Sequence, residues 1–231
     1  MAIVNSELGI VFLCTAKVAS TSLEKALENL SGSERIPGGK HMGLRNFTKK
    51  SLPMLEHKYP HAKFTSFCIV REPLERLNSW WRYRARLHAE HKNSTAGMPF
   101  IEFVESHLEY LNGNKTSAKS NVQFSPQTKW VLDSRNKYVT DKVFAVEKFE
   151  EVGEFLQSRT SEVVRIRRRN VSPMQDNSDI SSIQGKLLED LKRSLDLDYK
   201  IHELALRSPD SVKQFLDNFP NEVENSTQKF F

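Results

Sequence analysis

The sequence is poor in cysteine, glycine and long apolar runs, and each shortage excludes a class of protein. Two cysteines, Cys14 and Cys68, stand among 231 residues, both inside apolar runs, so a disulfide scaffold is excluded and buried, reduced thiols are expected. Glycine and proline number nine each, which excludes collagen-like and low-complexity chains. The longest uncharged apolar stretch, Leu8 to Ala16, is far shorter than the roughly 20 residues that span a bilayer.

No secretory leader is expected either, because no basic segment precedes the first apolar run and Glu7 stands at its entrance. We therefore expect a soluble, cytoplasmic protein. The composition, 38% hydrophobic and 27% charged, is globular, and the length suits one domain over residues 1–231. Residues 176–231 are expected to form a helical C-terminal part packed on that domain.

The net charge of +5 is unevenly distributed. Residues 176–231 contain 11 acidic and 7 basic residues, so the excess of positive charge lies in residues 1–175. A basic region of this kind predicts an anionic ligand: a phosphorylated cofactor, an acidic glycan or a nucleic acid.

Short apolar runs alternate with helical patterns along the chain. Strands are predicted over 9–14, 64–70, 143–146 and 163–168. Helices are predicted from about 20 to 30, 48–59, 73–91, 147–158 and, in several pieces, 181–219. The alternation predicts an α/β protein with a P-loop-like three-layer fold, in which helices flank a central, mostly parallel sheet. Ligands of such sheets bind at the carboxyl ends of the strands.

The segment after the first of these strands has the composition of a phosphate site. It contains, in order, Lys17, Val18, Ala19, Ser20, Thr21 and Ser22. Small residues let backbone N–H groups approach an anion, the helix start adds a favourable dipole, and the lysine adds a positive charge. The segment is not a Walker A motif, because it lacks glycine and the terminal Lys-Ser/Thr pair. The alternative is an ordinary helix start, in which Thr21 and Glu24 form a capping box beside a solvated lysine.

A second constellation follows the strand 64–70. Arg71 comes directly after the strand, Pro73 suits the first turn of a helix, and Ser79 follows two turns into that helix. An arginine at a strand end can bind a phosphate in a fork, and the serine hydroxyl can reach the same group. The alternative is a helix-start arginine paired with Glu72 or Glu75.

Together the two segments resemble those of sulfotransferases that use 3′-phosphoadenosine 5′-phosphosulfate (PAPS), in particular the carbohydrate, membrane-type sulfotransferase family. Residues 12–22 look like that family's 5′-phosphosulfate loop, and residues 67–79 look like its 3′-phosphate element. A looser likeness continues through 124–127, 146–149 and 169–172.

The resemblance implies a role for each matching residue. Lys17 is implied to contact the oxygen that bridges sulfate and phosphate, and residues from Val18 to Ser22 to hold the 5′-phosphate. Arg71 and Ser79 are implied to hold the 3′-phosphate. Asn170 and Ser172 are weaker candidates for closing over the nucleotide.

The acceptor hydroxyl needs a general base, and His41 is the first choice. A histidine titrates near neutrality, and His41 stands between the two phosphate segments, where the resembling family has a catalytic histidine. Glu56, His57 and His61 are alternatives, and Glu147 is a more remote one; the histidines at 88, 91, 107 and 202 are expected to be solvated. No cluster of residues has metal-ligand spacing, so no metal is expected.

These residues predict an enzyme that moves a sulfuryl group from PAPS, its co-substrate, to a hydroxyl, most plausibly of a carbohydrate, by in-line transfer. One alternative is a P-loop-type nucleotide or small-molecule kinase, which the missing Walker A residues disfavour. Another is a non-catalytic basic module that binds nucleic acid, which needs a contiguous basic face. The arginines at 165 and 167–169 either line a channel for an acidic acceptor, support the 3′-phosphate, or are solvated.

Overall fold

The structure, a computed structural model, describes residues 2–38, 41–114, 121–133, 138–167 and 178–218. Within these ranges the chain forms two compact units. The first unit contains the residues up to Arg71, those from Gln127 to Arg167 and those from Ile201 to Asn218. The second contains the residues from Glu72 to Pro126 and from Ser178 to Lys200.

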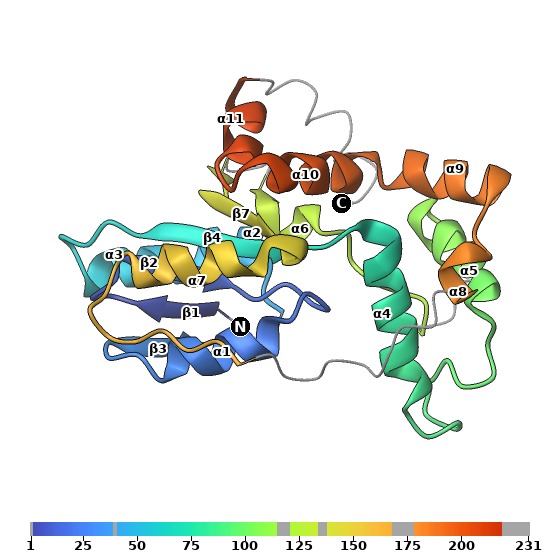
Figure 1. Ribbon diagram of the computed structural model, residues 1–231, viewed down its shortest axis with the longest axis horizontal. Coiled ribbons are helices and arrows are strands. Elements are labelled where there is room, and N and C mark those ends of the chain that lie inside the picture. The colour runs from blue at the N-terminus through green and yellow to red at the C-terminus, as the bar shows by residue number, and fades with distance from the viewer. Residues whose placement is uncertain (1, 39–40, 115–120, 134–137, 168–177, 219–231) are drawn as a thin grey trace. The chain divides into compact units, whose positions relative to one another are not determined.

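The first unit is built on a sheet whose described part has five strands, in the order β3-β1-β2-β4-β7 (Figure 1). Their bounds are β1 (Ala2–Asn5), β2 (Ile10–Leu13), β3 (Ser33–Ile36), β4 (Thr65–Val70) and β7 (Lys142–Ala145). β2, β4 and β7 pair in parallel, whereas β1 is antiparallel to both of its neighbours, so four of these strands run in one direction. The predicted, mostly parallel sheet is confirmed, and the carboxyl ends of β2, β4 and β7 share one edge.

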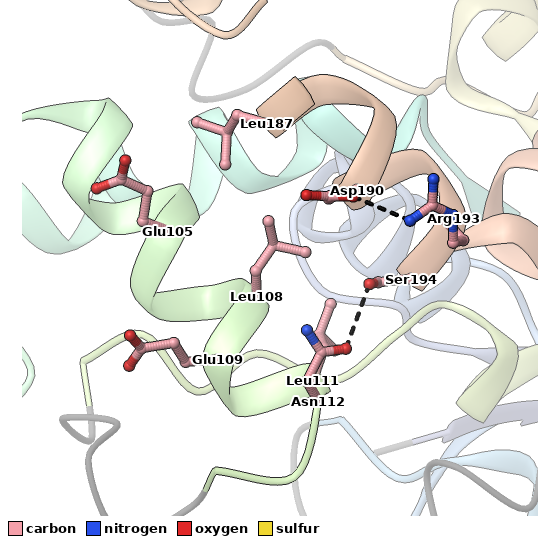
Figure 2. Close-up of a pocket in the computed structure, with 9 residues that line it drawn as sticks. All are labelled: Glu105, Leu108, Glu109, Leu111, Asn112, Leu187, Asp190, Arg193 and Ser194. Atoms are coloured by element: carbon pink, nitrogen blue, oxygen red, sulfur yellow. Dashed lines mark hydrogen bonds and ion pairs between the residues drawn. The ribbon is translucent and has the colours of Figure 1, made fainter. Parts of the chain in front are cut away.

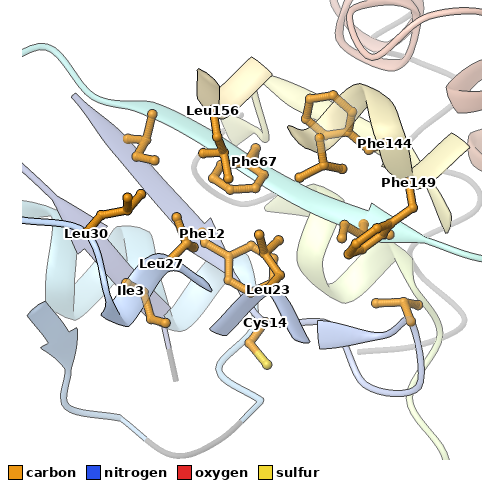
Figure 3. Close-up of a cluster of buried hydrophobic side chains, with 14 residues drawn as sticks. Ile3, Phe12, Cys14, Leu23, Leu27, Leu30, Phe67, Phe144, Phe149 and Leu156 are labelled. Atoms are coloured by element: carbon orange, nitrogen blue, oxygen red, sulfur yellow. The ribbon is translucent and has the colours of Figure 1, made fainter. Parts of the chain in front are cut away.

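Helices cover both faces of this sheet. Figure 1 shows α7 (Phe149–Gln157) in front of the sheet and α3 (Leu52–Lys58) behind it. α1 (Ser20–Glu28) and α7 bury Leu23, Leu27 and Leu156 in one cluster with Phe12 and Phe67 of the sheet (Figure 3). The expected three-layer α/β fold is therefore confirmed. A short helix α2 (Leu44–Asn46) and a π-helix (Phe47–Ser51) lead into α3.

The outer edge of β7 is closed by the C-terminal helices α10 (Asp196–Arg207) and α11 (Ser211–Asn218). Pro209, between them, accepts a hydrogen bond from the Val143 N–H at 2.9 Å. Lys142 pairs with Asp210 at 2.7 Å beside this contact. An edge strand with free N–H groups invites aggregation, and this connection protects it. A small helix α6 (Thr128–Val131) and a hairpin of β5 (Leu132–Asp133) and β6 (Tyr138–Val139) precede β7, and a 3-10 turn (Val146–Lys148) follows it.

The second unit is helical. It contains α4 (Pro73–Ala85), α5 (Phe100–Leu111), α8 (Ser178–Ser181), α9 (Gly185–Ser194) and the first residues of α10. Side chains of α4 form a stack with Phe124: the Trp80 and Phe124 rings lie 4.3 Å apart, Arg84 lies over Trp80, and Arg76 lies 3.9 Å above Phe124. Trp81 packs on Phe100, as expected of a helix core face.

The predicted strand over 163–168 is wrong in its described part, because residues 163–167 form no strand. Val164 and Ile166 do alternate inward onto the core, as the pattern indicates. The side-chain amide of Gln157, however, bonds the start of this segment, since it accepts from Val164 N–H at 3.1 Å and donates to Glu162 O at 3.0 Å. A side chain thus occupies the place that a neighbouring strand would take.

The helix predicted over 73–91 ends earlier, at Ala85. Thr95 bonds its last turn, because the Thr95 hydroxyl donates to Trp81 O at 2.7 Å and the Thr95 N–H donates to Arg84 O at 3.5 Å. Several elements escaped prediction, among them β1, β3, α5, α6 and the hairpin of β5 and β6.

Candidate functional site

The loop between β2 and α1 has a strained backbone. Lys17 and Ala19 adopt positive φ angles of 68° and 59°, a left-handed conformation that costs a residue with a side chain about 1–2 kcal/mol. Left-handed residues set into a tight turn are the backbone form from which anion-binding nests are built. Strain of this kind persists where the surrounding structure enforces it, and it concentrates at functional sites. The loop therefore has the backbone expected of an anion site.

The side chains of this loop divide between the core and the surface. Val18 is completely buried in the hydrophobic cluster, so only its backbone is available to a ligand. Lys17 and Thr21 are half-buried, Ala19 is exposed, and Ser20 and Ser22 are buried. The exposed positions thus supply one ammonium group and one hydroxyl beside the backbone N–H groups.

α1 begins at Ser20, as predicted, but the predicted capping box is absent from the described structure. Ala19 is the N-cap and offers no side-chain oxygen, and Ser22 N–H bonds to Ala19 O at 3.1 Å. The first turn contains no acidic residue. The positive end of the helix dipole therefore meets no carboxylate in that turn, which leaves it suited to an external anion.

Glu24 is used beneath the loop instead of in a cap. Its buried carboxylate accepts a hydrogen bond from the Cys14 thiol at 2.6 Å. Burial, together with this bond to Glu24, raises the pKa of Cys14 to about 12, so the thiol stays protonated at neutral pH. Cys14 and Cys68 are both free and buried, as the sequence predicts.

His41 lies against the end of β2. Its Nδ1 is 3.2 Å from the carbonyl oxygen of Cys14 and 3.9 Å from the Cys14 sulfur. A carbonyl oxygen only accepts hydrogen bonds, so Nδ1 is the donor in this contact, and in the neutral ring the lone pair is then on Nε2. The histidine is thus brought to the same strand end as Lys17 in the tautomer that a general base needs.

The other candidates for the base lie in different surroundings. Glu56, His57 and His61 are exposed on α3 or directly after it. Glu147 is paired with His202, whose Nε2 lies 3.1 Å from the Glu147 carboxylate. The expectation that His202 is solvated is wrong, since it is only 8% exposed. His41, by contrast, contacts Cys14 at the end of β2.

The turn after β4 is held by a residue that sequence reasoning did not single out. Gln127, completely buried, accepts a hydrogen bond from Arg71 N–H at 2.8 Å and donates one to Arg71 O at 2.7 Å. Arg71 itself is half-buried at the end of the strand. The only sequence signal was that Gln127 closes the segment 124–127, which loosely resembles the family.

Ser79 lies on α4 in the second unit, two turns into the helix that Pro73 begins, as predicted. Arg76, between them in the motif, is buried and donates to Ser125 O at 3.0 Å. Burial lowers the pKa of Arg76 to about 9. Arg76 therefore anchors the chain around Ser125 within its own unit.

His107 is also buried, contrary to the expectation of a solvated side chain. Its Nδ1 donates to Val122 O at 2.8 Å, and burial lowers the pKa of His107 to about 4, so the ring is neutral at pH 7. This histidine has a structural task in the second unit.

Two of the predicted binding residues, Asn170 and Ser172, lie outside the described residues. The same holds for Arg168 and Arg169 of the arginine cluster. Arg165 and Arg167 are exposed, on the side of the chain opposite to Val164 and Ile166.

A pocket of about 440 Å³ lies between α5 and α9 in the second unit (Figure 2). None of the predicted site residues lines it. Leu108 and Leu187 form its apolar part, and the carboxylates of Glu105, Glu109 and Asp190 stand around it, with one ion pair of 3.0 Å between Asp190 and Arg193. Three carboxylates repel an anion, so this pocket is unsuited to a phosphorylated donor.

In the described ranges no group of three or more His, Cys, Asp or Glu side chains is placed to hold a metal ion. None of the described helices is long and apolar enough to cross a membrane.

The fold is that of an α/β protein, and the loop at the carboxyl edge of its sheet has a backbone suited to an anion. A family model described as the sulfotransferase family matches residues 1–205, and the chain belongs to this family. No curated protein matches this chain. Membership makes the protein a transferase of sulfuryl groups from a small-molecule donor to a hydroxyl acceptor, and it disfavours the kinase and nucleic-acid alternatives.

Proposed function

We propose that the protein transfers a sulfuryl group from PAPS to a hydroxyl of a carbohydrate, with His41 as general base. The observation that carries this proposal is the convergence at the end of β2: a strained loop with Lys17 leads into a nine-residue helix, and His41 contacts Cys14 at the start of that loop. The donor and the carbohydrate acceptor rest on the resemblance of residues 12–22 and 67–79 to the carbohydrate sulfotransferases.

The loop fits the 5′-phosphate of such a donor. Backbone N–H groups from Val18 to Thr21 and the hydroxyl of Thr21 are donors, Ser22 N–H being bonded to Ala19 O, and the start of α1 contributes its dipole. Lys17, half-buried in this loop, offsets the negative charge that grows on the leaving phosphate oxygen. Arg71 and Ser79 are assigned to the 3′-phosphate because of their positions in the second motif. Asn170 and Ser172 are assigned to closing over the nucleotide because of their positions in the segment 169–172.

In the reaction the acceptor oxygen forms a bond to sulfur while the bond from sulfur to the 5′-phosphate oxygen breaks, and its electron pair leaves with adenosine 3′,5′-bisphosphate. His41 takes the hydroxyl proton on Nε2. The bond from Nδ1–H to Cys14 O holds the ring orientation and stabilises the imidazolium that results.

The helices after residue 176 belong, in this proposal, to the same catalytic domain. The family match runs through residue 205, and α10 and α11 close the edge of β7. One domain over residues 1–231 is therefore the proposed organisation.

The proposal is tested by incubating the protein with ³⁵S-labelled PAPS and a panel of sugars, oligosaccharides and simple phenols. Transfer of label to a sugar hydroxyl, with release of adenosine 3′,5′-bisphosphate, is the expected result. Transfer to phenols alone contradicts the carbohydrate acceptor. Transfer to neither class of acceptor, with consumption of labelled ATP in a parallel assay, contradicts the donor.

A further inference from the structure

The backbone of Arg71 is gripped on both sides of its Cα atom by one side chain. Gln127 Oε1 accepts from Arg71 N–H at 2.8 Å, and Gln127 Nε2 donates to Arg71 O at 2.7 Å. The two residues are 56 positions apart in the sequence, and Gln127 is completely buried. A buried pair of hydrogen bonds of this kind is strong, because little water competes for it.

The two hydrogen bonds from Gln127 to Arg71 take the place of pairing with a further strand. β4 pairs with β7 up to Val70, whose partner is Ala145, and the sheet ends there. In an antiparallel pair, two residues exchange both of their N–H···O bonds, and a primary amide offers the same donor and acceptor in one plane. Gln127 thus bonds Arg71, the residue that follows the strand, with the donor and the acceptor that an opposed backbone would offer.

Gln127 is itself held in place. The backbone carbonyl of Gln127 accepts a hydrogen bond from Trp130 N–H at 2.9 Å, at the start of α6. Trp130 O in turn accepts from the Thr140 hydroxyl at 2.7 Å, and Thr140 N–H donates to Val131 O at 2.9 Å. The backbone of Gln127 is therefore linked by hydrogen bonds, through Trp130, to Thr140, which shortly precedes β7.

Fixing the N–H and C=O of one residue restricts its φ and ψ, and with them the direction of its Cα–Cβ bond. We propose that Gln127 is a positioning residue that aims the Arg71 guanidinium at the 3′-phosphate of the donor, and so determines specificity for a 3′,5′-bisphosphate nucleotide. This inference rests on the proposed function, because it takes the 3′-phosphate as the ligand of Arg71. A misplaced guanidinium loses its two-pronged fit to phosphate while the rest of the nucleotide site stays intact.

The test compares two ligands that differ by one group: adenosine 3′,5′-bisphosphate and adenosine 5′-monophosphate. Their dissociation constants are measured by calorimetry for the wild type, Gln127→Met, Arg71→Ala and the double variant. Methionine has nearly the volume of glutamine but makes neither hydrogen bond. We expect Gln127→Met to weaken the bisphosphate about 10- to 100-fold and the monophosphate less than twofold. The double variant should bind the bisphosphate no more weakly than Arg71→Ala alone.

Asn5→Leu is the matched control. Asn5 is another completely buried amide with two backbone contacts, since it donates to Ser31 O at 2.7 Å and accepts from Leu8 N–H at 2.8 Å. It lies at the opposite edge of the sheet, where Asn5 pairs with Ile10, the first residue of β2. Its loss should lower the melting temperature as Gln127→Met does, but leave the ratio of the two dissociation constants unchanged.

The outcomes separate the inference from the proposed function. Equal weakening of both ligands by Gln127→Met, or an additive loss in the double variant, overturns the positioning role. A wild type that does not distinguish the two ligands, or an Arg71→Ala variant that still does, overturns the 3′-phosphate assignment itself. If Gln127→Met does not fold, Gln127→Glu decides the question: it keeps the acceptor for Arg71 N–H but loses the donor, and should show a smaller, still 3′-specific loss.

Discussion

The turns that follow β2 and β4 end neighbouring parallel strands, but different forces hold their shapes. After β2 the chain takes left-handed angles at Lys17 and Ala19, with no side-chain cap on α1 in the described structure. After β4, Gln127 pins the backbone of Arg71, and the Glu72 side chain caps α4 by accepting from Glu75 N–H at 2.6 Å. The first turn has strained, left-handed backbone angles, and the second is held by side-chain hydrogen bonds to its backbone.

The difference matches what each turn is proposed to do. A loop that binds an anion through N–H groups needs its own backbone exposed, so side chains that cover it are a disadvantage. A turn that binds through one guanidinium needs its Cα–Cβ direction fixed, and its backbone can be buried. We therefore expect changes in the first turn to affect catalysis most, and changes in the second to affect ligand binding.

Lys17→Ala should give the largest effect. Removing the charge that offsets the leaving oxygen is expected to lower kcat about 10³-fold, while adenosine 3′,5′-bisphosphate binds within a few-fold of the wild type. Steady-state kinetics with PAPS and calorimetry provide the two numbers. Lys25→Ala is the control, because Lys25 is an exposed lysine of α1 whose partner is Glu28 at 3.2 Å. Comparable losses of kcat in both variants would contradict the role of Lys17.

His41→Ala should lower kcat at least 10²-fold and remove the acidic limb of the pH–rate profile, since the base must be deprotonated to act. Binding of adenosine 3′,5′-bisphosphate should not change. His57→Ala and His61→Ala, at exposed positions on and after α3, should retain wild-type rates. If either of them loses the acidic limb and His41→Ala keeps it, the assignment of the base is wrong while the fold and the donor site stand.

Ala19→Gly tests the strain directly and should have the smallest effect. Glycine adopts the left-handed conformation at φ 59° without the steric cost of a Cβ atom, so the free energy of unfolding should rise by a few tenths to about 1 kcal/mol. Ala26→Gly, within α1, should lower it by about 1 kcal/mol. Urea unfolding of both variants gives the comparison. A loss of stability in Ala19→Gly as large as that in Ala26→Gly would show that the loop is unstrained.

Local patterns in the sequence predict much of this architecture. The runs 9–14, 64–70 and 143–146 became β2, β4 and β7, because a strand buried on both faces needs an unbroken apolar run. The pattern over 163–168 has the right alternation but forms no strand in its described part, where Gln157 bonds the Val164 N–H. Burial alternates in any extended chain that lies on a core, so alternation alone does not establish pairing.

The residues of the candidate site also divide into those that the sequence predicts and those that it does not. Lys17, Arg71 and Ser79 stand at fixed distances from a strand end, and their places follow from local spacing. Gln127 does not, because its contact with Arg71 joins residues 56 apart and depends on how α6 is packed. The Cys14–Glu24 bond was hidden for another reason: Glu24 fits a capping box in sequence, but a left-handed Ala19 takes the N-cap position.

The central claim, a bisphosphate nucleotide site at the carboxyl edge of β2 and β4, is tested most directly by thermal unfolding with adenosine 3′,5′-bisphosphate, ADP and ATP with magnesium. A ligand at a hundredfold excess over its dissociation constant stabilises the fold by about 2.7 kcal/mol, which raises Tm by roughly 5–10 °C for a chain of this length. We predict this rise with the 3′,5′-bisphosphate and its loss in Arg71→Ala. A rise with ATP alone, or with none of the three, would contradict the account.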